Sequence, residues 1–145
     1  MDRKSTSGCC QFLGSSLISW HSKKQNSVAL STAEAEYIAA GACCSQLLWI
    51  AQQLRDLGLD FTGIPIKCDN TSAISITKNP VQHSRTEHID VRHHFIRDHA
   101  EKGDIVLEFV PTDLQLADIF TKPLSEVRFV ALRLELGMIN RDALV

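Results

Sequence analysis

The sequence lacks any apolar run approaching the roughly 20 residues that a helix needs to span a bilayer. Its opening stretch, "MDRKS", is polar and has no apolar segment of the kind that a secretory signal requires. Internal repeats, low-complexity runs and linker-like segments are also absent. These absences exclude a transmembrane helix within the sequence and favour a cytoplasmic location, with the nucleus also open.

Cysteine pairs with the spacing of a structural metal site are missing too. The five cysteines are odd in number, and no two of them form a Cys-x-x-Cys motif. Adjacent cysteines rarely share a zinc ion or bridge each other. We therefore expect reduced thiols in an intracellular protein. The cysteines are Cys9, Cys10, Cys43, Cys44 and Cys68.

A large net charge is likewise absent, since the formal charge at pH 7 is only -2. Bulk electrostatics therefore do not indicate a nucleic-acid partner. The first 25 residues are nevertheless basic, because they set four lysines and arginines against Asp2 alone. This segment is consistent with contact to phosphates or with a solvated hairpin edge.

What the sequence does contain is an alternation of strand-like and helix-like segments in a length suited to one domain. Turn residues and hydrophobic periods divide it in order. The predicted elements are a hairpin over 8–20, a helix over 32–57, a strand over 64–69, helices over 72–78 and 87–103, a strand over 104–110, and helices over 112–122 and 127–136. This order predicts an α/β fold with a mixed sheet.

Two glutamates near the start of the first helix have different predicted roles. Ser31 and Glu34 have the spacing of a capping box, which gives Glu34 a local role. Glu36 lies at the head of an apolar stripe on a helical wheel of about 100° per residue, and Glu34 lies about 160° away from it. A core-facing carboxylate is costly unless it is paired, protonated or bound to a cation. Glu36 is therefore a candidate ligand, or else an edge residue that reaches water or a lysine. The stripe comprises Ala40, Cys43, Leu47, Ile50, Leu54 and Leu57.

Two aspartates occupy positions that suit the same chemistry. Asp69 ends a predicted strand, and ligand sites in α/β sheets gather beyond the carboxyl ends of strands. Asp118 lies among apolar residues in "LADIF". Each has a plain alternative, since Asp69 is equally suited to an Asx turn and Asp118 to a solvent-facing position. Together with Glu36 they predict a site for Mg²⁺ or Mn²⁺, which prefer oxygen ligands.

Longer motifs carry a family resemblance. In order they are "DRKSTSG", "LISWHSKKQ", "STAEAEYIA", "CDNTSAI", "KNPVQHSRTEHIDVRHHFIRDH" and "VPTDLQLADIFTKPL". They resemble the C-terminal ribonuclease H region of copia-type retrotransposon Pol polyproteins, over residues 1–137, with 138–145 as a tail. The resemblance implies a ribonuclease H-like mixed sheet flanked by helices, from which the family's first, central strand is missing.

The resemblance also implies a reaction and a set of ligands. Family members hydrolyse the RNA strand of RNA–DNA hybrids with two divalent cations held by four acidic residues. Three of these match Glu36, Asp69 and Asp118, which are therefore the expected catalytic and metal residues. The fourth belongs to the strand that the chain lacks, and Asp2 does not match it. We therefore expect weak activity or none from this chain alone, or a non-catalytic remnant that binds nucleic acid or another partner.

Substrate contacts are expected from residues between the second and third ligands. The resemblance places the histidine- and arginine-rich segment near substrate, although a solvated helix face or a zinc site are alternatives. The expected partners are an RNA–DNA hybrid and the reverse transcriptase of the same polyprotein. On the helical wheel Trp49 and Ile38 lie away from the apolar stripe, where they would either contact the reverse transcriptase or be partly covered by the hairpin or the C-terminal helix. The substrate-binding candidates are Asn70, Ser72, Arg85, His88, Arg92 and His94.

Overall fold

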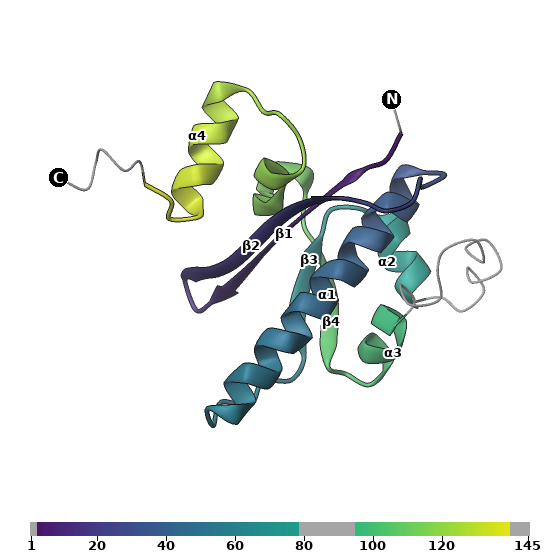
Figure 1. Cartoon of the computed structure of the whole chain (residues 1–145), viewed down its shortest axis with the longest axis vertical. Helices are drawn as coiled ribbons and strands as arrows, with labels where there is room; N and C mark the ends of the chain where they lie inside the picture. Colours follow the sequence, from purple (N-terminus) through teal and green to yellow (C-terminus); the bar gives the residue numbers. More distant parts are fainter. Residues whose placement is uncertain (1–2, 79–94, 140–145) are drawn as a thin grey trace. The chain divides into compact units, whose positions relative to one another are not determined.

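The computed structural model describes residues 3–78 and 95–139. The chain divides into two compact units. The first combines residues up to Ser27 with those from Leu116 onward, and the second runs from Val28 to Gln115. Within the described residues, each unit contains one two-stranded sheet (Figure 1).

The first unit begins with a β-hairpin. Strand β1 (Thr6–Leu13) pairs antiparallel with β2 (Ser16–Lys24), with a bulge between Gln11 and Phe12. Gly14, at φ 62°, occupies the turn, where a left-handed backbone favours glycine. Burial in β1 alternates with the two-residue period of a strand, so one face is covered and the other is more exposed.

Two further elements complete the first unit. The 3₁₀ helix η4 (Leu116–Phe120) packs on β1, and helix α4 (Glu126–Glu135) packs on η4. The contact with β1 requires glycine at position 8. A Cβ there would lie 2.6 Å from Thr121 Cγ2 and 2.9 Å from Phe120 Cβ. Gly8 therefore permits the close approach that positions η4.

The second unit places helices against a parallel strand pair. It contains helix α1 (Thr32–Asp56), strand β3 (Ile64–Cys68), helices α2 (Thr71–Lys78) and α3 (Phe95–Glu101), strand β4 (Ile105–Phe109) and the 3₁₀ helix η3 (Thr112–Leu114). β3 pairs with β4, with Ile66 opposite Leu107. The core joins all three α-helices to both strands. Its members include Tyr37, Cys44, Ile66, Cys68, Ala73, Ile76, Ile96, Ile105 and Leu107.

The start of α1 is capped as the sequence predicts, with one difference. Ser31 Oγ accepts a hydrogen bond from the backbone N–H of Glu34 at 3.1 Å. Oε2 of Glu34 reaches back to the backbone N–H of Leu30 at 2.7 Å, one residue before the helix cap. The first bond satisfies a donor that the helix leaves open, and the second fixes the chain that enters the helix.

The buried face of α1 is centred on other residues than the predicted apolar stripe. The buried residues include Tyr37, Cys44 and Ala51, whereas Leu57 is 78% exposed. Ile38, predicted to lie away from the core, is buried. The buried face of α1 includes the small residues Ala40, Gly41, Cys44 and Ala51, and a wheel weighted toward large apolar residues misses all of these except Ala40. Of the two glutamates, Glu34 is the more buried, because its carboxylate folds back onto the cap.

The continuous helix predicted over 112–122 does not form. The chain forms η3 and η4, interrupted at Gln115, whose backbone is extended (φ -78°, ψ 103°). The Gln115 side chain donates from Nε2 to the backbone oxygen of Lys67 at 3.0 Å. This long-range bond favours the extended conformation over a continuous helix.

The remaining elements agree with prediction within a few residues at their ends, and the mixed α/β architecture is confirmed. In the part of the predicted helix 87–103 that the structure describes, α3 is present. The boundary at residue 137 stays a prediction. Among the described helices, none combines the length and apolar character that crossing a membrane would require.

Candidate metal centre

Three side chains of the second unit converge at one point. Among the described residues, ligand atoms of Glu36, Cys68 and Asp69 lie within 4.8 Å of one another. Glu36 and Asp69 are half-buried, and Cys68 is buried. The structure thus brings together two of the three carboxylates that the sequence predicts as ligands, although they are 33 positions apart in the chain.

Local structure explains how these groups meet. Glu36 lies near the start of α1, where the N-terminal end of the helix favours negative charge. Asp69 follows directly after β3, at the carboxyl end of a parallel strand pair. Packing of α1 on β3 brings the two ends together. The arrangement therefore follows from a helix start and a strand end that share one core.

Asn70 and Ser72 lie beside this cluster in the sequence. Oδ1 of Asn70 accepts a hydrogen bond from the backbone N–H of Ala73 at 2.9 Å, which caps α2. Ser72 is exposed on the first turn of that helix. Asn70 thus has a structural role in the folded chain, and a substrate role for either residue stays a prediction.

The thiol of Cys68 is the member of the cluster that sequence reasoning missed. Its pKa is raised to about 11, chiefly by burial and to a smaller extent by the carboxylates of Glu36 and Asp69, while the contact with the Asn70 backbone opposes part of the increase. At neutral pH the thiol is therefore protonated and adds no charge to the two carboxylates. Its Sγ lies 3.7 Å from the backbone oxygen of Asn70. The signal available in the sequence was its position directly before Asp69 at the end of a strand.

Burial also governs the tyrosine next to Glu36. Tyr37 is fully buried, and this burial raises the pKa of its hydroxyl to about 12. The positive charge of Arg97 opposes part of this increase. Arg97 itself donates from Nη2 to the backbone oxygen of Ile76 at 2.8 Å, which ties α3 to the end of α2. The burial of Tyr37 in the core anchors the helix turn that also carries Glu36.

The third predicted ligand, Asp118, belongs to the first unit. It is 7% exposed within η4. Its Oδ2 accepts from Arg128 Nη2 at 3.1 Å and lies 3.4 Å from Lys122 Nζ. The solvent-facing alternative for Asp118 is therefore wrong, and in this structure two side-chain cations balance its charge. Its role as a metal ligand stays a prediction.

The other predicted substrate residues, Arg85, His88, Arg92 and His94, lie outside the residues that the structure describes. The segment that follows them begins α3, where His99 Nδ1 lies 2.8 Å from Asp104 Oδ2. Of the side chains proposed to contact the reverse transcriptase, Trp49 is 60% exposed, as predicted, whereas Ile38 is buried.

The chemistry of the donor set fits a hard divalent cation. Two half-buried carboxylates at this separation repel each other unless a positive charge lies between them. Carboxylate oxygens are the ligands that Mg²⁺ and Mn²⁺ prefer. Glu36 and Asp69 are therefore suited to hold such an ion.

Comparison with known proteins identifies the chain's relatives. Two retrovirus-related Pol polyproteins from transposons of Arabidopsis thaliana, RE2 and RE1, are 43% and 42% identical over 96% and 94% of this chain. One from the Nicotiana tabacum transposon TNT 1-94 is 39% identical over 94% of it. The chain spans about a tenth of the length of these relatives. It is thus homologous to one segment of retrotransposon Pol polyproteins.

Two other comparisons gave no match. No protein-family model matches the sequence. No solved structure matches it either.

Proposed function

We propose that this chain supplies the ribonuclease H part of a retrotransposon Pol polyprotein and that its substrate is the RNA strand of an RNA–DNA hybrid. One observation carries the proposal: Glu36 and Asp69 meet at the end of a parallel strand pair, within a segment homologous to Pol polyproteins. The same two residues are those that the motifs "AEY" and "CDN" designate as ligands.

Glu36 and Asp69 would hold a divalent cation. By the resemblance, Asp118 in η4 is the third expected ligand. When bound, Mg²⁺ ions activate water and stabilise the charge that develops on the leaving oxygen. The chain's own contribution is to present the carboxylates in fixed positions. The capped start of α1 fixes Glu36, and the strand β3 with the Asn70 cap fixes Asp69.

Charge balance accounts for the weak ribonuclease activity that we expect from these residues alone. Two divalent ions carry four positive charges, whereas these 145 residues supply three of the four carboxylates that the resemblance implies. Each missing carboxylate removes several kcal/mol of electrostatic stabilisation from a site of this kind, which corresponds to about a hundredfold in rate or more. The fourth carboxylate is the one that a preceding strand contributes in the family.

The test compares the chain with a chimera that carries, ahead of residue 1, the segment preceding the homologous region in the tobacco relative. Both are incubated with a labelled RNA–DNA hybrid and Mg²⁺. We expect the chimera to cleave the RNA strand at least about a hundredfold faster than the chain alone. In the chimera, Glu36→Gln, Asp69→Asn and Asp118→Asn should each reduce the rate by a similar factor.

Glu108→Gln is the matched control, because Glu108 is an exposed carboxylate on β4. It should leave the rate unchanged. Folded chimera that fails to cleave the hybrid would contradict the proposal and favour the non-catalytic alternative. Cleavage that survives both Glu36→Gln and Asp69→Asn would place the reaction elsewhere in the protein.

A further inference from the structure

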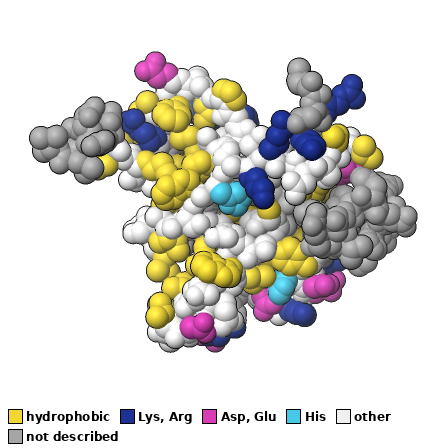
Figure 2. Space-filling view, viewed as in Figure 1, with side chains coloured by type: hydrophobic (Ala, Val, Ile, Leu, Met, Phe, Trp, Pro, Cys, Tyr) yellow, Lys and Arg dark blue, Asp and Glu magenta, His cyan; other side chains and the backbone are white. Residues whose placement is uncertain are grey.

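Helix α4 is apolar on two of its sides. Leu132 and, at the C-cap, Leu136 are each 3% exposed and hold one side within the first unit, where α4 packs on η4. The other side carries Val127, which is 83% exposed, and Leu134, which is 61% exposed. Figure 2 shows hydrophobic side chains on the surface of this helix, at the upper left of the view. A helix whose second side is also apolar is typical of one that packs against a further partner.

The apolar residues of this second side form one continuous stripe. On a helical wheel of about 100° per residue, all of them lie within roughly 60° of a common direction. Val127, Val130 and Leu134 have the i, i+3, i+7 spacing with which a helix presents anchors to a partner. Val130 is half-buried and Ala131 is exposed, and the two lie side by side at the centre. We call these four residues, Val127, Val130, Ala131 and Leu134, the α4 stripe.

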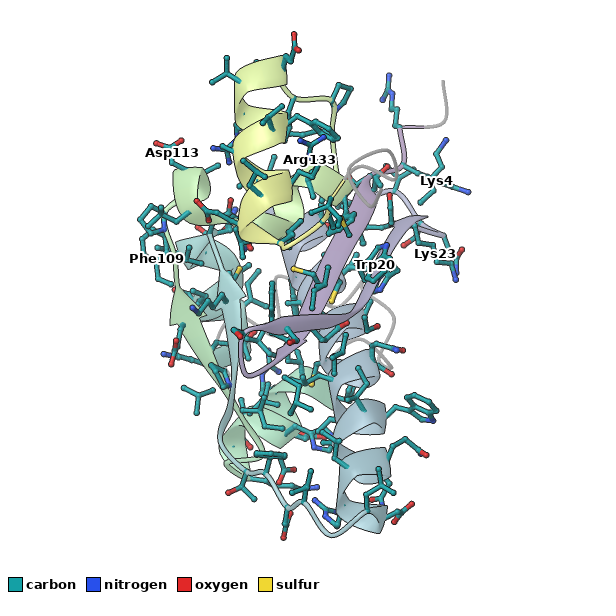
Figure 3. The ribbon with its side chains drawn as sticks, turned by 90° about the vertical axis from the view of Figure 1, so that its left-hand side faces the viewer. Lys4, Trp20, Lys23, Phe109, Asp113 and Arg133 are labelled. Atoms are coloured by element: carbon teal, nitrogen blue, oxygen red, sulfur yellow. The ribbon has the colours of Figure 1, made fainter. Side chains whose placement is uncertain are left out.

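One flank of the α4 stripe carries an acid at its start and a base at its end. Glu126 and Arg133 both lie roughly 100° from the centre of the stripe, on the same side of the wheel. Glu126 is exposed, and Arg133 is half-buried at the side of the helix (Figure 3). Within the described residues, the buried Nε of Arg133 has no hydrogen-bond partner. Arg128, on the opposite flank, is instead held by Asp118 at 3.1 Å. Arg133 is therefore the arginine of α4 that suits a carboxylate from a partner.

This charge pattern is self-complementary about a two-fold axis. In a dimer with such an axis, the same surface of both copies meets itself. When two copies of α4 run antiparallel, Glu126 of one copy faces Arg133 of the second copy, and the symmetry repeats the pair. Val127 and Leu134 then oppose each other in the same way. Antiparallel helices also place each positive N-terminal end near a negative C-terminal end.

We propose that the chain forms a homodimer in which the α4 stripes of two copies pack against each other in antiparallel orientation. The apolar side chains exclude water from the contact, and the pairs of Glu126 with Arg133 fix its register at the rim. A second copy is favoured over an unrelated partner, because one sequence supplies both halves of the complementary pattern. The surface includes neither Glu36 nor Asp69 and needs no metal ion, so it goes beyond the proposed hydrolysis.

The size of the α4 stripe predicts a weak dimer. The helix has 10 residues. At the usual rise per residue it is about 15 Å long, and a helix with its side chains is about 10 Å wide. A patch of these dimensions is smaller than the roughly 800 Å² that each partner buries in a standard stable interface. We therefore expect a dissociation constant of about 0.1 mM.

Sedimentation equilibrium of the whole chain, between about 10 μM and 1 mM, measures the association on both sides of this constant. The buffer contains EDTA, little salt and a reducing agent, which excludes crosslinks through the free cysteines. We expect the average mass to rise from that of a monomer toward that of a dimer. Leu134→Gln should weaken the association about tenfold or more, because it removes one apolar anchor from each copy.

Charge reversal tests the orientation of the two helices. Arg133→Glu should weaken the association about tenfold, because the symmetry then sets two pairs of like charges at the rim. The double variant Glu126→Arg/Arg133→Glu should restore the affinity of the parent, since both pairs form again with reversed signs. In a parallel arrangement the double variant would not recover, because Glu126 and Arg133 would lie at opposite ends of the contact.

Matched controls come from the second unit. Leu114 is 62% exposed, so Leu114→Gln is the control for Leu134→Gln. Lys102 is exposed, and Lys102→Glu is the control for Arg133→Glu. Both should leave the association unchanged. Circular dichroism and thermal unfolding check that every variant folds. Asp69→Asn should dimerise like the parent, which separates a failure of this inference from a failure of the proposed hydrolysis.

Three results would overturn the inference. The first is a chain that stays monomeric up to about 1 mM. The second is a Leu134→Gln variant that dimerises as tightly as the parent, which would place the contact elsewhere on the molecule. The third is a double charge variant that associates no more tightly than Arg133→Glu alone, which would exclude the antiparallel pairing.

Discussion

Nη2 of Arg128 lies 3.1 Å from Oδ2 of Asp118, so the last described helix is tied to η4 by a largely buried ion pair. Lys122 approaches the same oxygen from four residues along the chain. The carboxylate that we propose as a metal ligand is therefore already balanced by side-chain cations. A divalent ion and Arg128 would compete for one oxygen, which makes this ion pair relevant to both stability and metal affinity.

Removing the arginine should destabilise the fold. Because Asp118 is only 7% exposed, Arg128→Met leaves a buried carboxylate with one weaker partner. We expect a loss of about 1–3 kcal/mol in the free energy of unfolding by urea. Lys122→Met is the comparison. Its side chain is 53% exposed, so its loss should cost less than about 1 kcal/mol. If the two variants lose equal stability, the ion pair of Arg128 with Asp118 does not stabilise the fold more than that of Lys122 does.

Adding a single methyl group at position 8 should disturb η4. The Cβ of Gly8→Ala would meet Thr121 Cγ2 at 2.6 Å, Phe120 Cβ at 2.9 Å and the backbone oxygen of Ala117 at 3.0 Å. We expect destabilisation by about 1–3 kcal/mol, measured by urea unfolding. Thr121→Ser removes one of these contacts and keeps the hydroxyl that donates to the Asp118 backbone oxygen. The double variant Gly8→Ala/Thr121→Ser should therefore recover part of the stability that Gly8→Ala loses. Strictly additive effects of the two substitutions would argue against a close contact between residues 8 and 121.

Divalent cations should stabilise the second unit through Glu36 and Asp69. At a Mg²⁺ concentration ten times the dissociation constant, the expected gain is about 1.4 kcal/mol, visible as a rise in Tm. Asp69→Asn should abolish this gain. In EDTA the same variant should unfold at an equal or higher temperature than the parent, because it removes one of two like charges within 4.8 Å. Glu108→Gln should behave like the parent. A Mg²⁺ effect that persists in both Asp69→Asn and Glu36→Gln would refute the assignment.

High pH should destabilise the fold in part through Cys44. Burial raises the pKa of this thiol from 9.0 to about 12, with smaller contributions from Cys43 and Asp104. Above pH 9 the unfolded chain releases the proton while the folded chain keeps it. The stabilising effect is therefore complete below pH 9 and is lost as the pH rises toward 12, at up to about 1.4 kcal/mol per pH unit. Urea unfolding between pH 7 and 10.5 should show a shallower decline for Cys44→Ala than for the parent. Parallel declines would contradict this account.

Much of the fold follows from local sequence signals. The Ser31 and Glu34 pair marks the start of α1, and Gly58, with φ of 91°, follows its end. Turn residues delimit the hairpin and both strands of the parallel pair. These signals act over a few residues, so they can be read without knowledge of the tertiary structure. The continuous helix expected over 112–122 failed because a long-range bond from Gln115 to Lys67 opposes it.

The candidate site was predictable in part. Motifs and helix position selected Glu36 and Asp69, which the structure brings together. The helical-wheel argument selected Glu36, although two of its premises were wrong. It placed the centre of the buried face of α1 on the wrong residues and took Glu34 for the more exposed glutamate. Cys68 and the cations around Asp118 were not foreseen, because both depend on contacts that have no periodic signature.

The amino-acid sequence by itself determined the order of strands and helices, the caps and turns that delimit them, and the carboxylates that suit a cation. It also determined the uneven charge, since residues 3–33 contain no acid at all. Only the tertiary structure decided which face of α1 is buried, that Glu36 adjoins Cys68 and Asp69, and that Asp118 pairs with Arg128. The physical reason is that hydrogen bonding within a segment is local, whereas burial and charge pairing depend on side chains distant in the chain.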